Sequence, residues 1–168
     1  MQIPQPLFEQ DGKLFYQVQD NLILQEVQLV AFMMAIAVFE GFFIPPSDSR
    51  YPSKATRNNN PGNIRPVGAS EGFQKFNTAE EGWAVLRKQV LLNISRGLSL
   101  EEFFLGGETA DGGYYPGYSP VADNSVEIME NYISFVAQHT NMARDIDLRA
   151  YFPNLAKGGL KSTMIQGF

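Results

Sequence analysis

An isolated carboxylate follows the most apolar stretch of this sequence. Eleven consecutive apolar residues, 29–39, lead directly into Glu40, and Gly41 comes next. Phe42 and Phe43 crowd the same position. Apolar neighbours remove solvent from a carboxyl group, which favours its neutral form and raises its pKa, as a general acid near neutral pH requires. Glu40 is therefore the first candidate catalytic residue, although a solvated glutamate at a helix end would give the same pattern.

A cluster of amide side chains follows the Pro- and Ser-rich loop at 44–56. Residues 58–63 read Asn-Asn-Asn-Pro-Gly-Asn and are flanked by Arg57 and Arg65. Amides both donate and accept hydrogen bonds, so this segment suits a rigid polar rim that binds a neutral, hydroxyl-rich ligand. An ordinary turn stabilised by asparagine side chains would have the same composition. The candidate substrate-binding residues here are Asn59, Asn60, Asn63 and Arg65.

Tyrosines gather in a Gly-rich segment at 106–120, and aromatic rings suit stacking on sugar rings. Tyr115 and Tyr118 are the candidate substrate-binding residues in this segment, and packing within the loop is the alternative. Trp83 is aromatic too, but its spacing with Leu86 and Val90 places it on the apolar face of a helix, where we expect it to fill the core.

Glycoside cleavage usually needs a second carboxylate as nucleophile or base. Asp48 is the nearest candidate in the chain, and Glu71 and Glu80 are alternatives. Glu81 already has a role in a helix-capping box with Thr78. Because no strong partner emerges, the sequence favours a mechanism in which a single glutamate acts first as an acid and then as a base.

The composition argues against several other functions. The 168 residues include no cysteine and one histidine, so cysteine nucleophiles and cysteine zinc sites are excluded and zinc hydrolases are disfavoured. We expect no metal and no cofactor. Thirteen basic and eighteen acidic residues give a net charge of −5, which disfavours nucleic acid as a partner. The N-terminus does not resemble an export signal, and we expect no membrane span because the apolar run is too short.

The hydrophobic pattern predicts a mainly helical α+β fold. Helices are expected at 21–39, between a Thr78 cap and Gly97, from Asp123 or Asn124 to Thr140, and around 148–152. A further short helix is expected at 100–105, where Ser99 and Glu102 form a second capping box. The second half of the first helix is apolar on every side, so we expect it to be buried all round. The helix that ends at Thr140 should turn one face to the core, formed by Ile128, Tyr132, Phe135 and Val136.

Extended structure is expected in two places. Residues 7–18 flank Asp11-Gly12-Lys13 and predict a short hairpin or an extended arm. Residues 63–76 alternate loosely and predict a hairpin or a three-stranded β lobe. The predicted divisions are an N-terminal hairpin or arm at 1–19, a main domain at 20–144 and a C-terminal extension at 145–168.

Several of these segments together resemble a known group of domains. Glu40-Gly41-Phe42 at a helix end, followed by Arg-Asn-Asn-Asn-Pro-Gly-Asn-Ile-Arg at 57–65, is similar to the lysozyme-like lytic transglycosylase and virion-associated lysin domains of bacteriophages. Weaker similarity continues at 73–84, 99–103 and 118–132. The resemblance covers about residues 30 to 140 in a consistent order.

The resemblance implies a lysozyme-like fold with a small β lobe, and peptidoglycan glycan strands as the substrate. Glu40 would occupy the catalytic glutamate position, Asn60 and Asn63 would lie across the cleft, and Tyr118 would be a cleft tyrosine. Glu40 would protonate the β-1,4 linkage between N-acetylmuramic acid and N-acetylglucosamine and give a 1,6-anhydro product.

Such a protein would belong to a phage virion or be delivered to the host periplasm and cell wall. A hydrolytic muramidase and a non-catalytic phage structural protein with the same fold are the alternatives. The termini lie outside the resemblance, which leaves open a role for them in contacts with other phage virion proteins.

Overall fold

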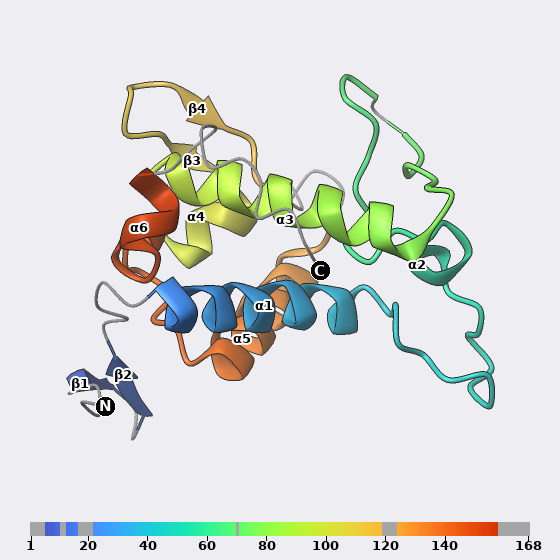
Figure 1. Ribbon diagram of the computed structural model, residues 1–168, viewed down its shortest axis with the longest axis horizontal. Helices are drawn as coiled ribbons and strands as arrows, with labels where there is room; N and C mark the ends of the chain where they lie inside the picture. Colours follow the sequence, from blue (N-terminus) through green and yellow to red (C-terminus); the bar gives the residue numbers. More distant parts are fainter. Residues whose placement is uncertain (1–5, 11–12, 17–21, 70, 119–123, 158–168) are drawn as a thin grey trace. The chain divides into compact units, whose positions relative to one another are not determined.

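The computed structural model describes residues 6–10, 13–16, 22–69, 71–118 and 124–157. The chain divides into two compact units: unit 1 comprises Met1–Val30 with Leu91–Phe168, and unit 2 comprises Ala31–Val90. The described residues are mainly helical, as predicted, and their strands are short (Figure 1). Two helices contribute residues to both units, α1 at Leu22–Phe39 and α3 at Ala79–Ser95.

The α1 helix keeps an apolar face exposed. Phe32 and Ile36 are fully buried, whereas Val30 is 54% exposed and Val38 is 45% exposed. The expectation that the second half of this helix is buried all round is therefore wrong, because hydrophobicity alone does not reveal which apolar residues meet a partner. By length and composition α1 could also cross a membrane, a property that core helices and signal sequences share.

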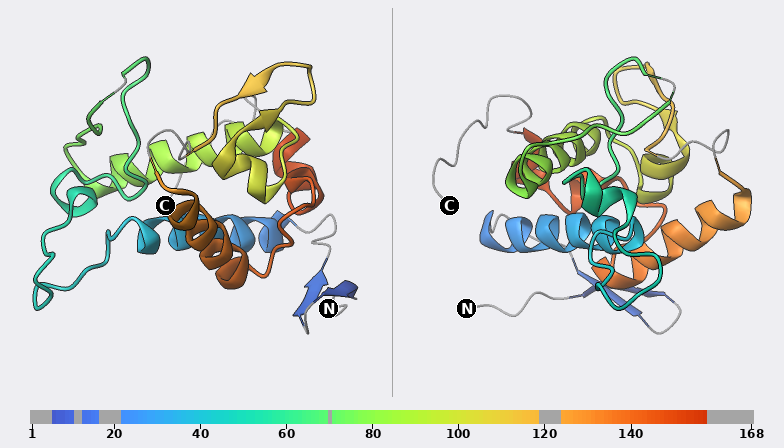
Figure 2. Two further views of the ribbon diagram at one scale, coloured as in Figure 1. Left: turned by 180° about the vertical axis from the view of Figure 1, so that it is seen from behind. Right: turned by 90° about the vertical axis from the view of Figure 1, so that its right-hand side faces the viewer.

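The described residues of unit 1 form four further helical segments, which Figure 2 shows from two sides. They are α4 at Leu100–Leu105, α5 at Val126–Thr140, the 3-10 helix η2 at Leu148–Ala150 and α6 at Pro153–Lys157. Helix α4 packs on α5, and η2 packs on α6. The side chain of Gln25 on α1 accepts hydrogen bonds from the backbone N–H groups of Asn154 and Leu155, so the first turn of α6 is fixed to α1.

Helix α5 departs from its prediction in its cap and in its buried face. Its N-cap is Ser125, whose hydroxyl accepts a hydrogen bond from the backbone N–H of Ile128 at 3.2 Å. Asn124 is thus not the cap, and Asp123 lies outside the described residues. Ile128 is exposed and Phe135 is only partly buried, so the predicted core face is partly wrong. The buried side chains of this helix are Met129, Tyr132, Ile133, Val136 and Thr140.

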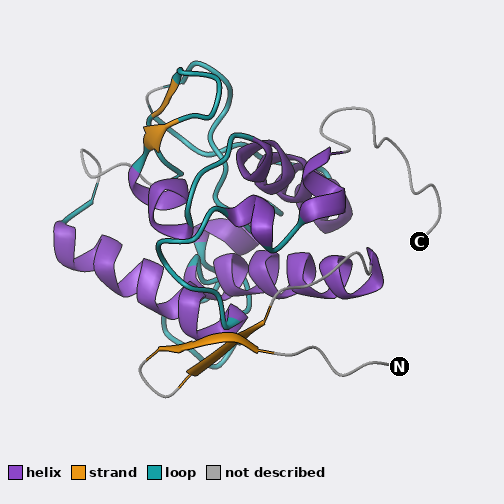
Figure 3. Cartoon of the chain, turned by 90° about the vertical axis from the view of Figure 1, so that its left-hand side faces the viewer, coloured by secondary structure: helices purple, strands orange, loops and turns teal. Residues whose placement is uncertain are grey.

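Two short antiparallel strand pairs occur among the described residues (Figure 3). Strand β1 at Pro6–Gln10 pairs with β2 at Lys13–Tyr16, at the place where the sequence predicts a hairpin. Strand β3 at Gly107–Glu108 pairs with β4 at Tyr114–Tyr115, inside the segment that we expected to be a loop. Both pairs belong to unit 1.

Unit 2 has no strand among its described residues, 31–69 and 71–90, and its one complete helix there is α2 at Lys54–Arg57. The predicted β lobe at 63–76 is therefore wrong. The backbone N–H of Gln74 does donate to the carbonyl of Ile64 at 2.8 Å, but the side-chain amide of Asn60 donates to both of these residues' carbonyls. The Asn60 side chain thus supplies the hydrogen bonds to these two carbonyl groups that a neighbouring strand would otherwise supply.

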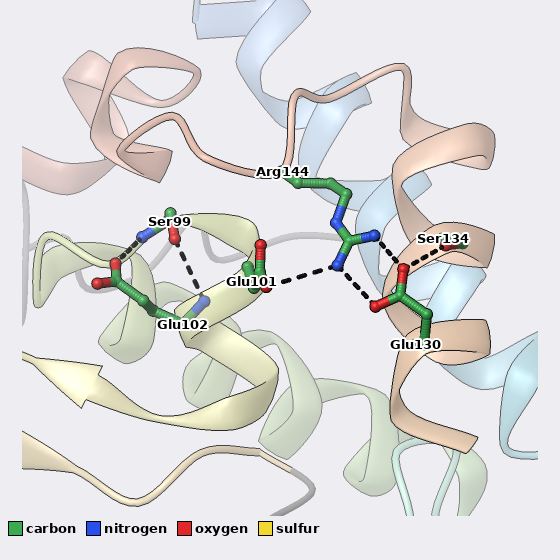
Figure 4. Close-up of polar contacts among 6 residues, drawn as sticks. All are labelled: Ser99, Glu101, Glu102, Glu130, Ser134 and Arg144. Atoms are coloured by element: carbon green, nitrogen blue, oxygen red, sulfur yellow. Dashed lines mark hydrogen bonds and ion pairs between the residues drawn. The ribbon is translucent and has the colours of Figure 1, made fainter. Parts of the chain in front are cut away.

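The cap of α4 is the one predicted from the sequence. The hydroxyl of Ser99 accepts from the backbone N–H of Glu102 at 3.2 Å, and the carboxylate of Glu102 accepts from the backbone N–H of Ser99 at 2.8 Å (Figure 4). This reciprocal pair satisfies two backbone donors that a helix start leaves without partners.

Arg144 lies between α4 and α5 in Figure 4 and pairs with a carboxylate from each. Its guanidinium donates to Glu130 on α5 and lies 3.6 Å from Glu101 on α4. The hydrogen bonds from Arg144 lower the pKa of Glu130 below its ordinary value. Glu130 and Glu101 are largely exposed, so this arrangement adds little stability.

The α4 cap gives a first prediction. Ser99→Ala removes the hydroxyl that accepts from Glu102, and we expect the free energy of unfolding to fall by about 1 kcal/mol. Urea denaturation followed by circular dichroism measures it. Ser134→Ala on α5 is the matched control, because this exposed hydroxyl makes only a 3.5 Å contact with Glu130. Equal midpoints for the two variants would show that the cap does not hold α4.

Candidate active site

Glu40 is the C-cap residue of α1. The backbone N–H of Gly41 donates to Val38 O at 3.0 Å, and that of Phe42 donates to Ala37 O at 2.9 Å. These two bonds form a Schellman motif, the commonest way for a helix to end. The motif needs a left-handed residue after the cap, which Gly41 supplies with φ of 79°. The chain direction after α1, and with it the position of Glu40, is therefore fixed by this glycine.

The location of Glu40 is electrostatically unusual. The carboxyl end of a helix carries partial negative charge from its unpaired carbonyl groups, so a carboxylate there is disfavoured relative to the neutral acid. Glu40 is also partly buried. The raised pKa that the sequence predicts for Glu40 from its apolar neighbours stays a prediction.

The turn that carries Glu40 is tied to α2. Ser53 is the N-cap of α2 and accepts from the backbone N–H of Thr56 at 3.1 Å. The hydroxyl of Thr56 in turn donates to the carbonyl of Phe42 at 3.1 Å. A methyl group on Gly41 would lie 2.9 Å from the Ile44 side chain, so the turn is also closely packed. The turn that follows Glu40 is thus fixed both to the end of α1 and to α2.

An aromatic surface lies directly beyond this turn. The rings of Phe42 and Phe43 meet edge to face at 5.2 Å, and Trp83 on α3 lies 5.6 Å from Phe42 and 6.1 Å from Phe43. Phe43 is 48% exposed and Trp83 is partly buried, so Trp83 is not the core residue that its helical spacing predicts. The two consecutive phenylalanines after Glu40 are the feature of the sequence that could have indicated an aromatic contact with Trp83. Exposed rings of this kind can stack on sugar rings.

The asparagine-rich loop is built by its own side chains. Asn60 is fully buried, and its carbonyl oxygen also accepts from the backbone N–H of Ile64 at 2.9 Å. Asn59 has a left-handed backbone with φ of 51° and donates to the carbonyls of Phe76 and Asn77. The structure gives both residues a role in holding the loop. Their proposed contact with substrate stays a prediction.

Asn63 is the loop residue that reaches Glu40. Its backbone is left-handed, with φ of 45°, and its N–H donates to Asn60 O at 3.0 Å. Its side-chain nitrogen Nδ2 donates to Glu40 Oε2 at 2.8 Å. Its side-chain oxygen Oδ1 is buried and has no hydrogen-bond partner within the part of the chain that the structure describes. The two motifs that the sequence singled out, at 40 and at 58–63, therefore meet in one hydrogen bond.

Helix α3 lies against this loop at a glycine. A methyl group on Gly82 would come within 1.9 Å of the carbonyl oxygen of Asn59 and 2.8 Å of Pro61. The helix backbone and the loop backbone are therefore in direct contact, and only glycine fits between them. The first turn of α3 is fixed as well, because Glu81 accepts from the backbone N–H of Asn77 at 3.0 Å.

The basic candidate Arg65 belongs to unit 2, and the tyrosine candidates belong to unit 1. Arg65 and Lys54 both lie over the ring of Phe73, at 5.8 Å and 5.6 Å from its centroid. Tyr115 is buried in unit 1, where its hydroxyl accepts from Asn93 at 2.9 Å and its ring lies under Arg96.

Tyr118 also belongs to unit 1. It stacks on Phe103 at 5.3 Å and meets Phe104 edge to face at 6.0 Å. Unlike Asn63, neither Tyr115 nor Tyr118 belongs to the unit that contains Glu40, and their contact with substrate stays a prediction.

Asp48, the first candidate for a second carboxylate, is held by Arg50. The guanidinium donates to both carboxylate oxygens, at 2.9 Å and 2.6 Å, and the Arg50 backbone N–H donates as well. These hydrogen bonds lower the pKa of Asp48 to about 2. Asp48 is therefore ionised at any pH where a cell wall is degraded and cannot act as the acid. No group of three or more His, Cys, Asp or Glu residues that could hold a metal occurs among the described residues.

Comparison of the chain with models of protein families, with curated proteins and with solved structures finds no match. The case for a function therefore rests on the geometry around Glu40 and on the resemblance of the sequence motifs.

The contact between α3 and the loop gives a second prediction. Gly82→Ala places a methyl group against backbone atoms that cannot move aside without opening the loop, and we expect a loss of stability of about 1–3 kcal/mol, as for other overpacked sites. Chemical denaturation measures it. Gly113→Ala is the control, because its methyl group would meet side chains and no backbone, those of Thr109 at 3.0 Å and Asp111 at 3.4 Å. A Gly82→Ala protein as stable as this control would mean that the loop does not rest on α3.

Proposed function

We propose that this protein is a peptidoglycan lytic transglycosylase of lysozyme-like fold, with Glu40 as its catalytic acid and base. The observation that carries the proposal is the 2.8 Å hydrogen bond from Asn63 to Glu40. It joins the two parts of the sequence that resemble phage lytic transglycosylases and lysins, and it does so at the one glutamate that lies at the end of an apolar helix. The substrate would be the glycan strands of peptidoglycan.

The reaction needs one group that can give up and regain a proton. Glu40 as the neutral acid would protonate the glycosidic oxygen between N-acetylmuramic acid and N-acetylglucosamine while that bond breaks. The resulting carboxylate would then remove the proton from the 6-hydroxyl of the muramyl residue, whose oxygen attacks the anomeric carbon. A 1,6-anhydro ring forms, Glu40 is protonated again, and no water is consumed.

The surroundings of Glu40 favour both of its states. The helix end and the partial burial favour the neutral acid, whereas the hydrogen bond from Asn63 favours the carboxylate. Opposing effects of this kind keep a carboxyl group close to balance, which suits a residue that acts as acid and base in turn. Phe43 and Trp83 supply an aromatic surface on which a sugar ring could stack beside Glu40.

The proposal places the protein at the bacterial cell wall. It would act as part of a phage virion or after delivery to the host periplasm, and the segments outside the resemblance would serve contacts with other virion proteins. A hydrolytic muramidase is the runner-up, and Asp48 is the second carboxylate that it would use. A non-catalytic phage structural protein is the third candidate function.

The deciding experiment is mass spectrometry of the soluble products that the purified protein releases from peptidoglycan. We expect products one water lighter than hydrolytic muropeptides, and we expect Glu40→Gln to abolish them while the protein stays folded. Glu127→Gln, at an exposed position in the first turn of α5, is the matched control and should retain full activity. Reducing-end products would favour the muramidase, and no products on several wall types would favour a structural role.

A second variant separates the two enzymatic mechanisms. Asp48→Asn removes the only charge that a hydrolase could use at this loop but leaves a similar shape. The transglycosylase mechanism predicts that cleavage stays within about twofold of the wild-type rate, because the carboxylate is exposed and paired with Arg50. The rate of muropeptide release tests this. A fall of several hundredfold, with Arg50→Gln nearly unaffected, would instead identify Asp48 as a catalytic group.

A further inference from the structure

The side-chain amide of Asn63 is only half satisfied. Its nitrogen donates to Glu40 Oε2 at 2.8 Å, but its oxygen is buried and has no partner within the part of the chain that the structure describes. A buried acceptor without a donor is costly, and in native proteins it calls for a reason. The unsatisfied atom belongs to the same amide that contacts the candidate acid and base.

Glu40 needs different partners in its two protonation states. The carboxylate accepts hydrogen bonds only, so it requires a donor such as Nδ2 of Asn63. The neutral acid carries a hydroxyl that donates, so it requires an acceptor. Oδ1 of Asn63 is such an acceptor, and rotation of the amide by half a turn about χ2 exchanges the positions of Oδ1 and Nδ2.

The backbone around Asn63 permits this rotation and little else. The residue has a left-handed backbone and donates to Asn60 O, and Asn60 is itself buried with three side-chain hydrogen bonds. The direction of the Cα–Cβ bond is therefore fixed. The χ2 torsion of asparagine is broad and nearly two-fold, so exchange of the two ends of the amide requires no movement of the loop.

We propose that Asn63 is a positioning residue whose amide reverses with the proton on Glu40, so that it holds the carboxyl group in one place as both acid and base. This inference rests on the proposed function of Glu40. In the acid state Oδ1 accepts from the Glu40 hydroxyl. After the proton leaves for the glycosidic oxygen, Nδ2 donates to the carboxylate, and the amide reverses again when the 6-hydroxyl proton arrives.

The residue type fits this role. An arginine or lysine at position 63 would only donate and would favour the carboxylate, and an aspartate would mainly accept and would favour the neutral acid. An amide does both and carries no charge. Of the charged residues on the neighbouring segments, Lys54 on α2 and Arg65 in the loop lie over Phe73, and Glu81 on α3 accepts from the Asn77 backbone.

Two substitutions distinguish a positioning role of Asn63 from a role in loop packing alone. Asn63→Gly keeps the left-handed backbone, which glycine adopts freely, but removes both ends of the amide. Asn63→Asp keeps the shape and the acceptor but loses the donor. Asn141→Gly is the matched control, because this residue is also left-handed, with φ of 55°, and caps α5 in unit 1.

The expected kinetics differ for each variant. Loss of a hydrogen bond to a charged group should lower kcat by about ten- to hundredfold in Asn63→Gly, with KM unchanged because the amide acts through Glu40. Asn63→Asp should move the alkaline limb of the pH–activity profile to higher pH, since Glu40 must be neutral to protonate the glycosidic oxygen and a second carboxylate favours that neutral form. A rise in KM at constant kcat, or a lower stability with normal kcat and pH profile, would overturn the inference.

Nuclear magnetic resonance tests the reversal without relying on activity. In a ¹⁵N-labelled protein, the side-chain N–H₂ pair of Asn63 is identified by its loss in Asn63→Gly and is followed from pH 3 to pH 9. We expect one titration step in the wild type that disappears in Glu40→Gln. A wild-type signal that does not titrate would overturn the inference. Titration without release of muropeptides would uphold the coupling between Asn63 and Glu40 and refute the proposed enzyme.

Discussion

The candidate site depends on how α1 ends. A long apolar helix has to stop where its hydrophobic face stops, and here a Schellman motif stops it at Gly41. Because this motif fixes the last turn and the direction of the next residues, it also fixes the backbone position of the C-cap residue. Glu40 occupies that C-cap. The turn that follows supplies Phe42 for the contact with Thr56 on α2 and Phe43 for the contact with Trp83 on α3.

A second constraint fixes the loop that carries Asn63. Unit 2 lacks strands in its described residues, so the backbone of the loop at 58–76 needs other hydrogen-bond partners. Asparagine side chains supply them, with Asn60 serving Ile64 and Gln74 and Asn59 serving Phe76 and Asn77. A loop held by side chains can place residues at left-handed positions, where a strand could not. Asn59 and Asn63 are both left-handed, and the contact with Glu40 follows from the placement of Asn63.

Local signals in the sequence predicted the elements that local interactions determine. The end of α1 at Gly41 and the Ser99–Glu102 box depend on residues a few positions apart, and both form as expected. The β lobe was predicted from a loose alternation of Ile64, Val67, Phe73 and Phe76, but Val67 is fully exposed and the segment is a loop. Alternation describes which residues are apolar. It does not show whether a side chain distant in the sequence, here Asn60, already occupies the backbone groups.

The same limit applies to the site itself. Glu40 could be chosen from the sequence because an ionisable group after an apolar helix is rare enough to notice, and Asn63 because its segment is dense in amides. The sequence could not show which asparagine of that segment holds the loop and which reaches Glu40. All four are the same residue type and differ only in the partners that the fold gives them. Trp83 was assigned to the core for a related reason: helical spacing identifies a face of α3, whereas the contact with Phe42 and Phe43 depends on where α1 ends.

The chemistry proposed for Glu40 needs a carboxyl group that is neither firmly neutral nor firmly charged. A helix C-terminus alone would favour the neutral acid, and a salt bridge such as the one between Arg50 and Asp48 would fix the carboxylate, with a pKa near 2 in that case. An uncharged amide is the intermediate choice. The Asn63 amide supports the carboxylate by a hydrogen bond at 2.8 Å. It carries no positive charge that would hold Glu40 in its ionised form. In the proposed mechanism, the helix end and the amide would together take the place of the second carboxylate that many glycosidases use.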